Sequence, residues 1–454
     1  MAGGDMRPGG KGQEGGYYPR RRLFWIGVLT LFTAAMLFAL RAGLTGEMRA
    51  DIFAGVDNPG EAIGKAIGAA FLGFGFTLFL VSPLLDAIGI GNVLRGAGLC
   101  FLGGIGLTLA SSSVGDPAIV ENVFWLGMLV QGIGWGAMEA AVNPMTTALY
   151  PEEKTHRLNV LHAWWPAGII VGGLIGFAAS SFDIPWRMAM ASALLPSVGV
   201  LLLSVGLKFP PTERAAEGIS FLDMMMEVVR APSFLLWLGA MLLTASIELG
   251  PGAWVDAALS AKVGFNAVLL LVYVAGLMFV MRHFAGPLAH RFSNPGLLWL
   301  SSLFAMVGLF LMARAVSPVA VVAAATIWGI GVCFLWPTMM ASVSERYPRG
   351  GSWFIGLIGS AGAVAIYFLL PMLGGIYDNA MTQSAGGAAN LAELRAAGTA
   401  EAAAQLSAIE AEAAPQAFEF VAQLPIVLLV LFGAIWLFDR RNRINPAREA
   451  EAAE

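Results

Sequence analysis

A carboxylate lies deep inside a hydrophobic stretch of the sequence, where it could bind and release a proton. Glu139 shares this stretch with Asn143, and the stretch ends at Tyr150. A helical rise of about 1.5 Å per residue puts Glu139 roughly 16 Å from Tyr150, near the middle of a hydrocarbon core about 30 Å thick. Ionisable residues at that depth are costly to bury and usually face a cavity, a partner or an ion path. Glu139 is therefore predicted to be a proton-coupling residue, with a structural hydrogen-bonding role as the alternative.

Polar and aromatic side chains in other hydrophobic stretches could form a solute-binding cavity around this acid. Glu248 precedes the Gly250-Pro251-Gly252 break, where unwound backbone could coordinate a ligand or a cation; a place in the outer mouth is the alternative. Trp336 lies about 18 Å from the end of its stretch by helical rise, too deep for an interfacial aromatic belt. His162 could titrate with the acid or only donate a hydrogen bond. The predicted solute-binding residues are Asn143, Asn159, His162, Trp165, Glu248, Trp254 and Trp336.

The composition is that of a polytopic membrane protein. Of the 454 residues, 57% are hydrophobic and only 12% are charged, which is too apolar for soluble domains. No basic cluster is interleaved with aromatic residues, so nucleic-acid binding is excluded. Cys100 and Cys333 have no second Cys or His at ligand spacing, so neither a disulfide framework nor a metal site is predicted. Because no Ser-His-Asp, HExxH or P-loop arrangement is present, we expect neither an enzyme nor a cofactor.

Twelve hydrophobic windows are long enough to span a membrane. The predicted spans are residues 23–43, 62–85, 92–112, 119–149, 157–180, 186–207, 233–258, 266–290, 295–314, 317–346, 353–377 and 417–438. They divide the chain into an N-terminal tail (1–22), a six-helix bundle (23–207), a linker (208–232), a second six-helix bundle (233–438) and a C-terminal tail (439–454). Within the second bundle, the Ala- and Glu-rich segment 379–416 is predicted to be a loose or partly helical outer loop.

The distribution of Lys and Arg predicts the orientation. If the N-terminus is inside, the inner segments hold 19 of the 26 basic residues and the outer segments hold 7. The positive-inside rule therefore places both tails and the linker in the cytoplasm, in a bacterial inner membrane. Arg282 is counted among the inner charges. Arg41, near the outer end of the first span, is expected to snorkel to the interface, with a place in the cavity as the alternative.

An internal repeat relates the two predicted bundles. Gly132-Ile-Gly134, followed by a Tyr-Pro pair, recurs 197 residues later as Gly329-Ile-Gly331 with its own Tyr-Pro pair. The same register places Trp336 opposite Glu139. Parallel repeats of this kind imply two bundles with a solute site between them near the midplane, opened alternately to each side. A looser copy pairs segments 82–86 and 286–290, and the predicted gating residues of these two loops are Asp86 and Arg291.

The stretch around the buried acid resembles the fucose-permease-like branch of the major facilitator superfamily. In that branch the fourth helix carries a Glu followed by an Asn-Pro pair, and the next helix opens with Arg-Leu-Asn. The matching residues here are Glu139, Asn143-Pro144 and Arg157-Leu158-Asn159. Segment 82–89 is similar to the superfamily's loop between helices two and three, although it lacks the leading Gly and the following basic residues. The resemblance implies an all-α integral membrane fold, with twelve transmembrane helices in two six-helix bundles.

Departures from the family pattern bear on the solute. The fucose permeases carry an acid in the first helix, where this chain has Arg41-Ala42-Gly43. His162 and Trp165 stand where the fucose permease has a Gln and an Asn, so two polar sugar contacts are altered. Fucose itself is therefore not predicted.

The sequence predicts a monomeric secondary active transporter that moves a small polar organic solute, with a sugar as the leading candidate, by alternating access. Its predicted partners are that solute, membrane lipid and protons as a possible coupling ion. Efflux of an amphipathic compound is the alternative within transport, suggested by the many Trp, Phe and Met residues. A sensor or scaffold that has the same fold but carries no net flux is the alternative from another class.

Overall fold

The computed structural model describes residues 18–442 except 54–55, 57, 115–116, 151–153, 213–214, 216–217 and 264–267. Most of the two predicted tails, residues 1–17 and 443–454, therefore lies outside the described residues. The described regular structure is entirely helical. Ten of its helical stretches are long and apolar enough to cross a membrane, judged by length and composition.

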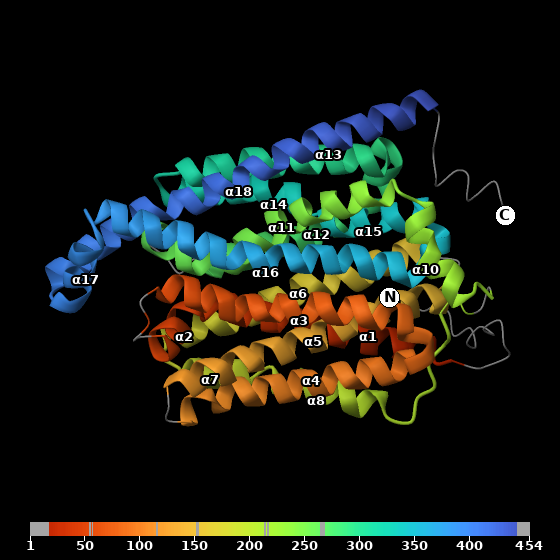
Figure 1. Cartoon of the computed structure of the whole chain (residues 1–454), viewed down its shortest axis with the longest axis horizontal. Coiled ribbons are helices and arrows are strands. Elements are labelled where there is room, and N and C mark those ends of the chain that lie inside the picture. The colour runs from red at the N-terminus through yellow and green to blue at the C-terminus, as the bar shows by residue number, and fades with distance from the viewer. Residues whose placement is uncertain are drawn as a thin grey trace, which may run out of the picture.

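The N-terminal half of the chain forms one group of long helices, drawn in red to yellow in Figure 1. Its helices are α1 (Arg20–Gly43), α2 (Thr45–Ile52), α3 (Pro59–Ile88), α4 (Ile90–Ala110), α5 (Pro117–Leu149), α6 (Lys154–Ser181), α7 (Trp186–Ala191) and α8 (Leu194–Ser204). The short α2 lies at one end of the group. The sixth predicted span is broken into α7 and α8 by a turn at residues 192–193.

The C-terminal half forms the second group, drawn in green to blue (Figure 1). Its helices are α11 (Phe234–Val263), α12 (Val268–Arg282), α13 (Ala285–Arg314), α14 (Pro318–Val332), α15 (Leu335–Arg346), α16 (Gly351–Ser384), α17 (Ala388–Ala397) and α18 (Ala400–Asn442). The helical geometry of α13 is interrupted at Ser293, where φ is 62°. The part of α13 before this break continues the eighth span, and the part after it forms the ninth.

All twelve predicted spans coincide with helices, and the predicted all-helical membrane fold is confirmed. The two spans outside the ten apolar stretches are α5 and α12. Polar Gln131, Glu139 and Asn143 interrupt the apolar sequence of α5, and α12 is only 15 residues long. Polar residues and short length mark helices that face protein rather than lipid.

The predicted outer loop is more regular than expected. α16 continues to Ser384, α17 follows, and α18 begins at Ala400 and runs for 43 residues. Ala and Glu are strong helix formers, so this composition extends the last two spans as helices beyond their apolar segments. Of the two forms expected for residues 379–416, loose or partly helical, the structure has the helical one.

The two ends of the molecule differ. The linker helix α10 (Phe221–Arg230) lies at the same end as the described chain termini, while α2 and α17 lie at the opposite end (Figure 1). We call these the linker end and the far end. The Ser220 hydroxyl caps α10 by accepting from the Asp223 backbone N–H at 3.0 Å. Hydrogen bonds from Ser220 and Arg230 hold the pKa of the Asp223 carboxyl below its usual range.

Small residues set how closely the two halves approach. α3 and α16 pack against each other between the halves, and a Cβ added at Gly356 would come within 2.4 Å of the Ser82 side chain. At the far end, the Glu61 backbone N–H donates to the Asp378 carboxylate at 3.2 Å. Within the first half, a Cβ at Gly172 would lie 2.5 Å from the Met36 carbonyl oxygen. Close backbone packing of this kind is typical of membrane helices.

Candidate functional site

A small cavity of about 30 Å³ lies between the two halves near the middle of the molecule. Each half contributes four of its lining residues, listed here from the N-terminal half and then the C-terminal half: Trp135, Glu139, His162, Trp165, Glu248, Leu249, Arg282 and Trp336. Five of the eight were predicted from the sequence to bind solute or protons. We call this the central cavity.

The N-terminal half supplies a chain of three hydrogen-bonded polar side chains. Glu139 is 4% exposed, and the Asn143 amide donates to its Oε1 at 3.1 Å. The Asn143 carbonyl oxygen in turn accepts from His162 Nε2 at 2.9 Å. Glu139 and Asn143 share a face of α5 because they are four residues apart, and His162 reaches them from α6. Among the described residues, no Lys, Arg or His lies within ion-pair distance of Glu139.

The C-terminal half supplies an acid that is paired with a base. Glu248 is 7% exposed, and its Oε1 accepts from Arg282 Nη2 at 3.3 Å. Its Oε2 accepts from the backbone N–H of Trp336 at 3.0 Å. That N–H belongs to the first turn of α15, where helical N–H groups have no partner within the helix. Glu248 therefore balances the charge of Arg282 and caps α15.

Two contacts join the halves at the central cavity. Arg282 Nη1 donates across the interface to the backbone oxygen of His162 at 3.1 Å. The Trp336 ring lies 6.2 Å from the Phe74 ring of the N-terminal half, centroid to centroid, and lines the central cavity together with Glu139. Trp336 therefore binds Glu248 through its backbone and shares the central cavity with Glu139.

Two arginines are buried, although both were expected at the membrane surface. Arg282, expected among the cytoplasmic charges, is the last residue of α12 and is 4% exposed. The signal was present, because residue 282 falls inside the predicted span 266–290 and an arginine inside a span indicates a buried partner. Arg41 is likewise buried, and its Nη1 donates to Gln131 Oε1 at 3.0 Å. The expectation that Arg41 snorkels to the interface was wrong.

Aromatic rings form one wall of the central cavity. Phe74 and Trp135 stack with ring centroids 4.4 Å apart, and Trp135 and Trp165 stack at 5.0 Å. Phe38 packs against the edge of Trp135 and against Trp165. Aromatic faces bury large apolar areas while their edges remain weakly polar. At about 30 Å³ the central cavity is too small for a ring-shaped solute in this conformation, so such a solute could bind only where the cavity widens.

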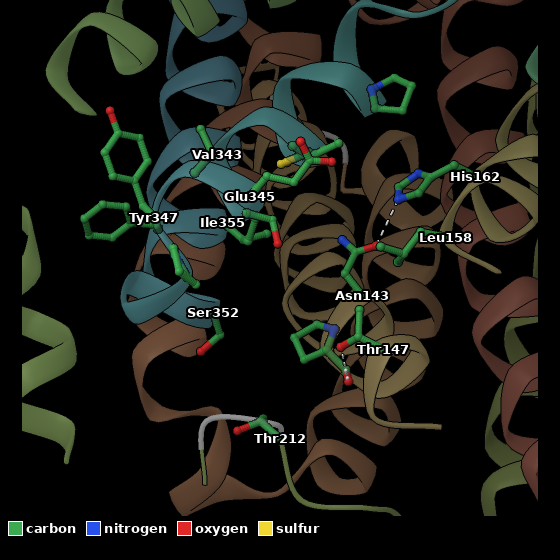
Figure 2. A pocket seen from close by; sticks show the side chains of 18 of the residues that line it. Asn143, Thr147, Leu158, His162, Thr212, Val343, Glu345, Tyr347, Ser352 and Ile355 are labelled. Carbon is green, nitrogen blue, oxygen red and sulfur yellow. Dashed lines mark hydrogen bonds between the residues drawn. The ribbon is translucent and has the colours of Figure 1, made fainter. Parts of the chain in front are cut away.

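A larger cavity of about 340 Å³ is lined in part by Thr212 and Ile219 of the linker, and it shares His162 with the central cavity. Asn143 and His162 form part of one wall, and α15 and α16 form the other, with Glu345, Tyr347 and Ile355 (Figure 2). Figure 2 shows Asn143 and His162 pointing toward one another at the inner part of this cavity. His162 lines both cavities. The Asn143–His162 pair therefore lies beside the larger cavity, and Asn143 connects it to Glu139.

The remaining predicted site residues lie elsewhere or outside the description. The side chains of Asn159 and Trp254 are not among the described side chains. Asp86 accepts from the backbone N–H of Thr212 in the linker at 3.3 Å. Arg291 lies 5.6 Å from the ring of its neighbour Phe292. Neither Asp86 nor Arg291 lines the two cavities.

Comparisons with known proteins agree with this architecture. Residues 23–376 match the family model described as Major Facilitator Superfamily. Among solved structures, the fold is similar to the xylose transporter XylE from E. coli in a partially occluded inward-open conformation, with a TM-score of 0.70 at 12% identity, covering 91% of this chain and 97% of that one. A bacterial homologue of the human lysosomal transporter Spinster, inward-facing and unoccupied, gives 0.67 at 15% identity, covering 95% and 100%.

The E. coli fucose:proton symporter FucP is also similar in fold. Its TM-score is 0.58 at 15% identity, and the match covers 89% of this chain and 99% of that chain. No curated protein sequence matches the chain. At these identities the structural likeness concerns the fold alone, so the roles of individual residues must be argued from their own geometry.

Proposed function

Because the chain belongs to the Major Facilitator Superfamily, whose members are membrane transporters, we propose that it is a proton-coupled secondary active transporter. Its proposed solute is small, neutral and hydroxylated, with a sugar as the leading candidate. Transport proceeds by alternating access of the central cavity to the two ends of the molecule. The proposal also places the linker end in the cytoplasm, so the conformation described here is open to the inside.

The observation that carries the proposal is the environment of Glu139. The carboxylate is buried, accepts a hydrogen bond from the neutral Asn143 amide, and lines the central cavity together with the neutral Trp336 indole. An unpaired charge is expensive to bury at membrane depth, whereas a protonated carboxyl group carries none. Proton binding therefore favours the state in which the cavity is closed. Solute binding favours the same state by filling the cavity, and this common preference couples the two.

The charges around the cavity favour a neutral solute. Arg282 is the cation among the residues that line the central cavity, and Glu248 balances its charge. An anionic solute would meet Glu139 without a free cation to receive it. Hydroxyl groups, in contrast, can donate to Glu139 and exchange hydrogen bonds with Asn143 and His162. The aromatic wall suits the apolar face of a sugar ring, and two proteins of similar fold are named for xylose and fucose transport.

A second candidate function is export of an amphipathic compound. The cavity at the linker end is lined by Met340, Phe354 and Ile355 among other apolar residues. An apolar vestibule of this volume could receive a larger hydrophobic molecule from the inner side. The neutral-solute proposal is preferred because polar side chains, including Glu139 and His162, line the central cavity and would leave an amphipathic compound's apolar part unmatched.

The test uses purified protein. A thermal-stabilisation screen of neutral sugars, polyols, acidic sugars and amphipathic amines should select a neutral hydroxylated compound. Adding that compound to lightly buffered proteoliposomes should alkalinise the outer medium as protons enter with it. Selection of an acidic sugar or an amphipathic amine would contradict the proposed solute class. Solute uptake without proton movement would contradict the coupling.

The proposed orientation has a separate test. In a background without native cysteines, a cysteine at Ser384 should react with an impermeant maleimide added to intact cells. A cysteine at Ser220, in the linker, should react only after the cells are opened. The reverse pattern would place the linker end outside.

A further inference from the structure

Arg282 has a function that charge balance with Glu248 does not account for. Its guanidinium group makes three hydrogen bonds, one to Glu248 and two to backbone carbonyl oxygens. Nε donates to the Cys333 oxygen at 3.0 Å, within the C-terminal half. Nη1 donates to the His162 oxygen at 3.1 Å, across the interface in the N-terminal half.

Both carbonyl groups have been freed by a proline four residues later. In a continuous α-helix the oxygen of residue i accepts from the N–H of residue i+4, and proline has no N–H. Pro166 therefore leaves the His162 oxygen without its helical donor, and Pro337 does the same to the Cys333 oxygen. Within a membrane-spanning helix such an oxygen needs another donor, from a neighbouring helix, a side chain or an ordered water.

A third proline in the same region follows the same rule. Pro251 frees the oxygen of Ile247, and Trp328 Nε1 donates to that oxygen at 3.0 Å. This bond lies within one half, between α11 and α14. Arg282 differs because its two carbonyl partners belong to different halves.

We propose that Arg282 is a positioning residue that ties α6 of one bundle to the α14–α15 break of the other, by satisfying the two proline-freed carbonyl groups. The proposal rests on the transport function proposed above and assigns Arg282 no contact with the solute. Arg282 binds the backbone oxygen of His162. The His162 side chain donates to Asn143, and Asn143 donates to Glu139. The guanidinium group thus fixes the distance between the paired acid of one half and the proton-binding acid of the other.

Glu248 completes the tie. Without a carboxylate beside it, a buried guanidinium group would be strongly unfavourable. The second oxygen of Glu248 accepts from the Trp336 N–H, so the break between α14 and α15 is bonded on both sides. Arg282 binds the carbonyl before the break, and Glu248 binds the N–H after it. The break predicted at Gly250-Pro251-Gly252 is absent, because α11 continues through Pro251. Pro166 lies inside the continuous helix α6 and Pro337 lies in the first turn of α15, so one guanidinium group serves two proline-freed carbonyl groups in different helical settings.

The test is a cycle of four proteins: wild type, Pro166→Ala, the charge-neutral pair Arg282→Gln with Glu248→Gln, and the triple variant. The alanine introduced by Pro166→Ala supplies the N–H that the His162 oxygen lacks. The pair should lower the melting temperature of the purified protein by several degrees. In the triple variant at least half of that loss should be recovered. Equal losses with Pro166 present and with Pro166 replaced would overturn the tie.

The same cycle with Pro337→Ala tests the Cys333 carbonyl. This second cycle is used if Pro166→Ala by itself destabilises α6. Arg282→Lys keeps the positive charge but offers one nitrogen to three acceptors. Its melting temperature should therefore stay close to that of the neutral pair and well below that of the wild type. A wild-type melting temperature in Arg282→Lys would show that only the charge matters, and would contradict the proposed role of the two carbonyl bonds.

A second readout separates positioning from simple stability. Counterflow of radiolabelled D-xylose into proteoliposomes gives KM and the maximal rate for each folded variant. The neutral pair should raise KM roughly fivefold, the size expected when one ordinary hydrogen bond of the site is lost through misplacement, and Pro166→Ala should partly restore it. An unchanged KM beside a lowered melting temperature would leave Arg282 a purely structural role and contradict positioning. If the wild type shows no counterflow with any sugar, the proposed function fails, and the melting cycle still decides the tie.

Discussion

The two buried acids of the central cavity make an instructive comparison. Glu139 and Glu248 are buried to a similar degree, at 4% and 7% exposed, and they line the same cavity from opposite halves. Glu248 has an arginine partner, whereas Glu139 accepts a hydrogen bond from the neutral Asn143 amide. A carboxylate in an ion pair cannot be protonated without breaking that pair, while one with a neutral partner can. On this difference we propose a structural role for Glu248 and proton coupling for Glu139.

The largest effect that separates the two acids should be on stability. Glu248→Gln leaves Arg282 buried without a counter-charge, which costs about 3–5 kcal/mol for a buried pair. Glu139→Gln replaces one hydrogen-bonding group with another and should cost less than about 1 kcal/mol. Melting of the two purified variants measures the difference. Similar melting temperatures for both variants would remove the basis of the comparison.

A smaller effect is expected from Trp336→Phe, which changes the surroundings of Glu139 but not those of Glu248. The substitution removes the indole N–H near Glu139 but keeps the backbone N–H that binds Glu248. We expect a loss of about 1 kcal/mol in solute affinity, seen as a roughly fivefold rise in KM, with little change in melting temperature. A large fall in melting temperature with unchanged KM would show that the Trp336 side chain has a structural role, like Glu248, and does not affect solute binding.

The smallest effect should come from His162→Gln. A glutamine at this position can still donate to the Asn143 oxygen, and the backbone oxygen that binds Arg282 is unchanged. Proton-driven accumulation should therefore persist, with KM altered no more than a few fold. Loss of accumulation in this variant would transfer the coupling role from Glu139 to the imidazole.

Local spacing explains which parts of the site could be predicted. Glu139 and Asn143 are one helical turn apart, and His162 begins the next span, so a single stretch of sequence brings them together. The twelve spans followed from hydrophobicity in the same way. Arg282 meets Glu248, His162 and Cys333 from distant parts of the chain. Its place depends on how α6 and α11 and the α14–α15 junction lie relative to α12, which no local pattern specifies.

Segment 379–416 shows what composition leaves open. Its low hydrophobicity ends the predicted spans, and its Ala- and Glu-rich composition is compatible with either a loose or a partly helical segment. Helix propensity continues beyond the apolar segments, so α16 and α18 extend past them. Hydrophobicity predicts where a membrane span ends, whereas propensity and capping determine where its helix ends.

The most direct test of the central claim measures two kinds of flux in Glu139→Gln proteoliposomes, with the sugar selected by the stabilisation screen. Uphill accumulation driven by an imposed proton gradient should be abolished, because the glutamine cannot carry a proton. Exchange of labelled for unlabelled solute at equal pH should continue, because it requires only the cavity and its alternating access. Undiminished proton-driven accumulation in Glu139→Gln would contradict the account, and Glu139 would then be a structural residue like Glu248.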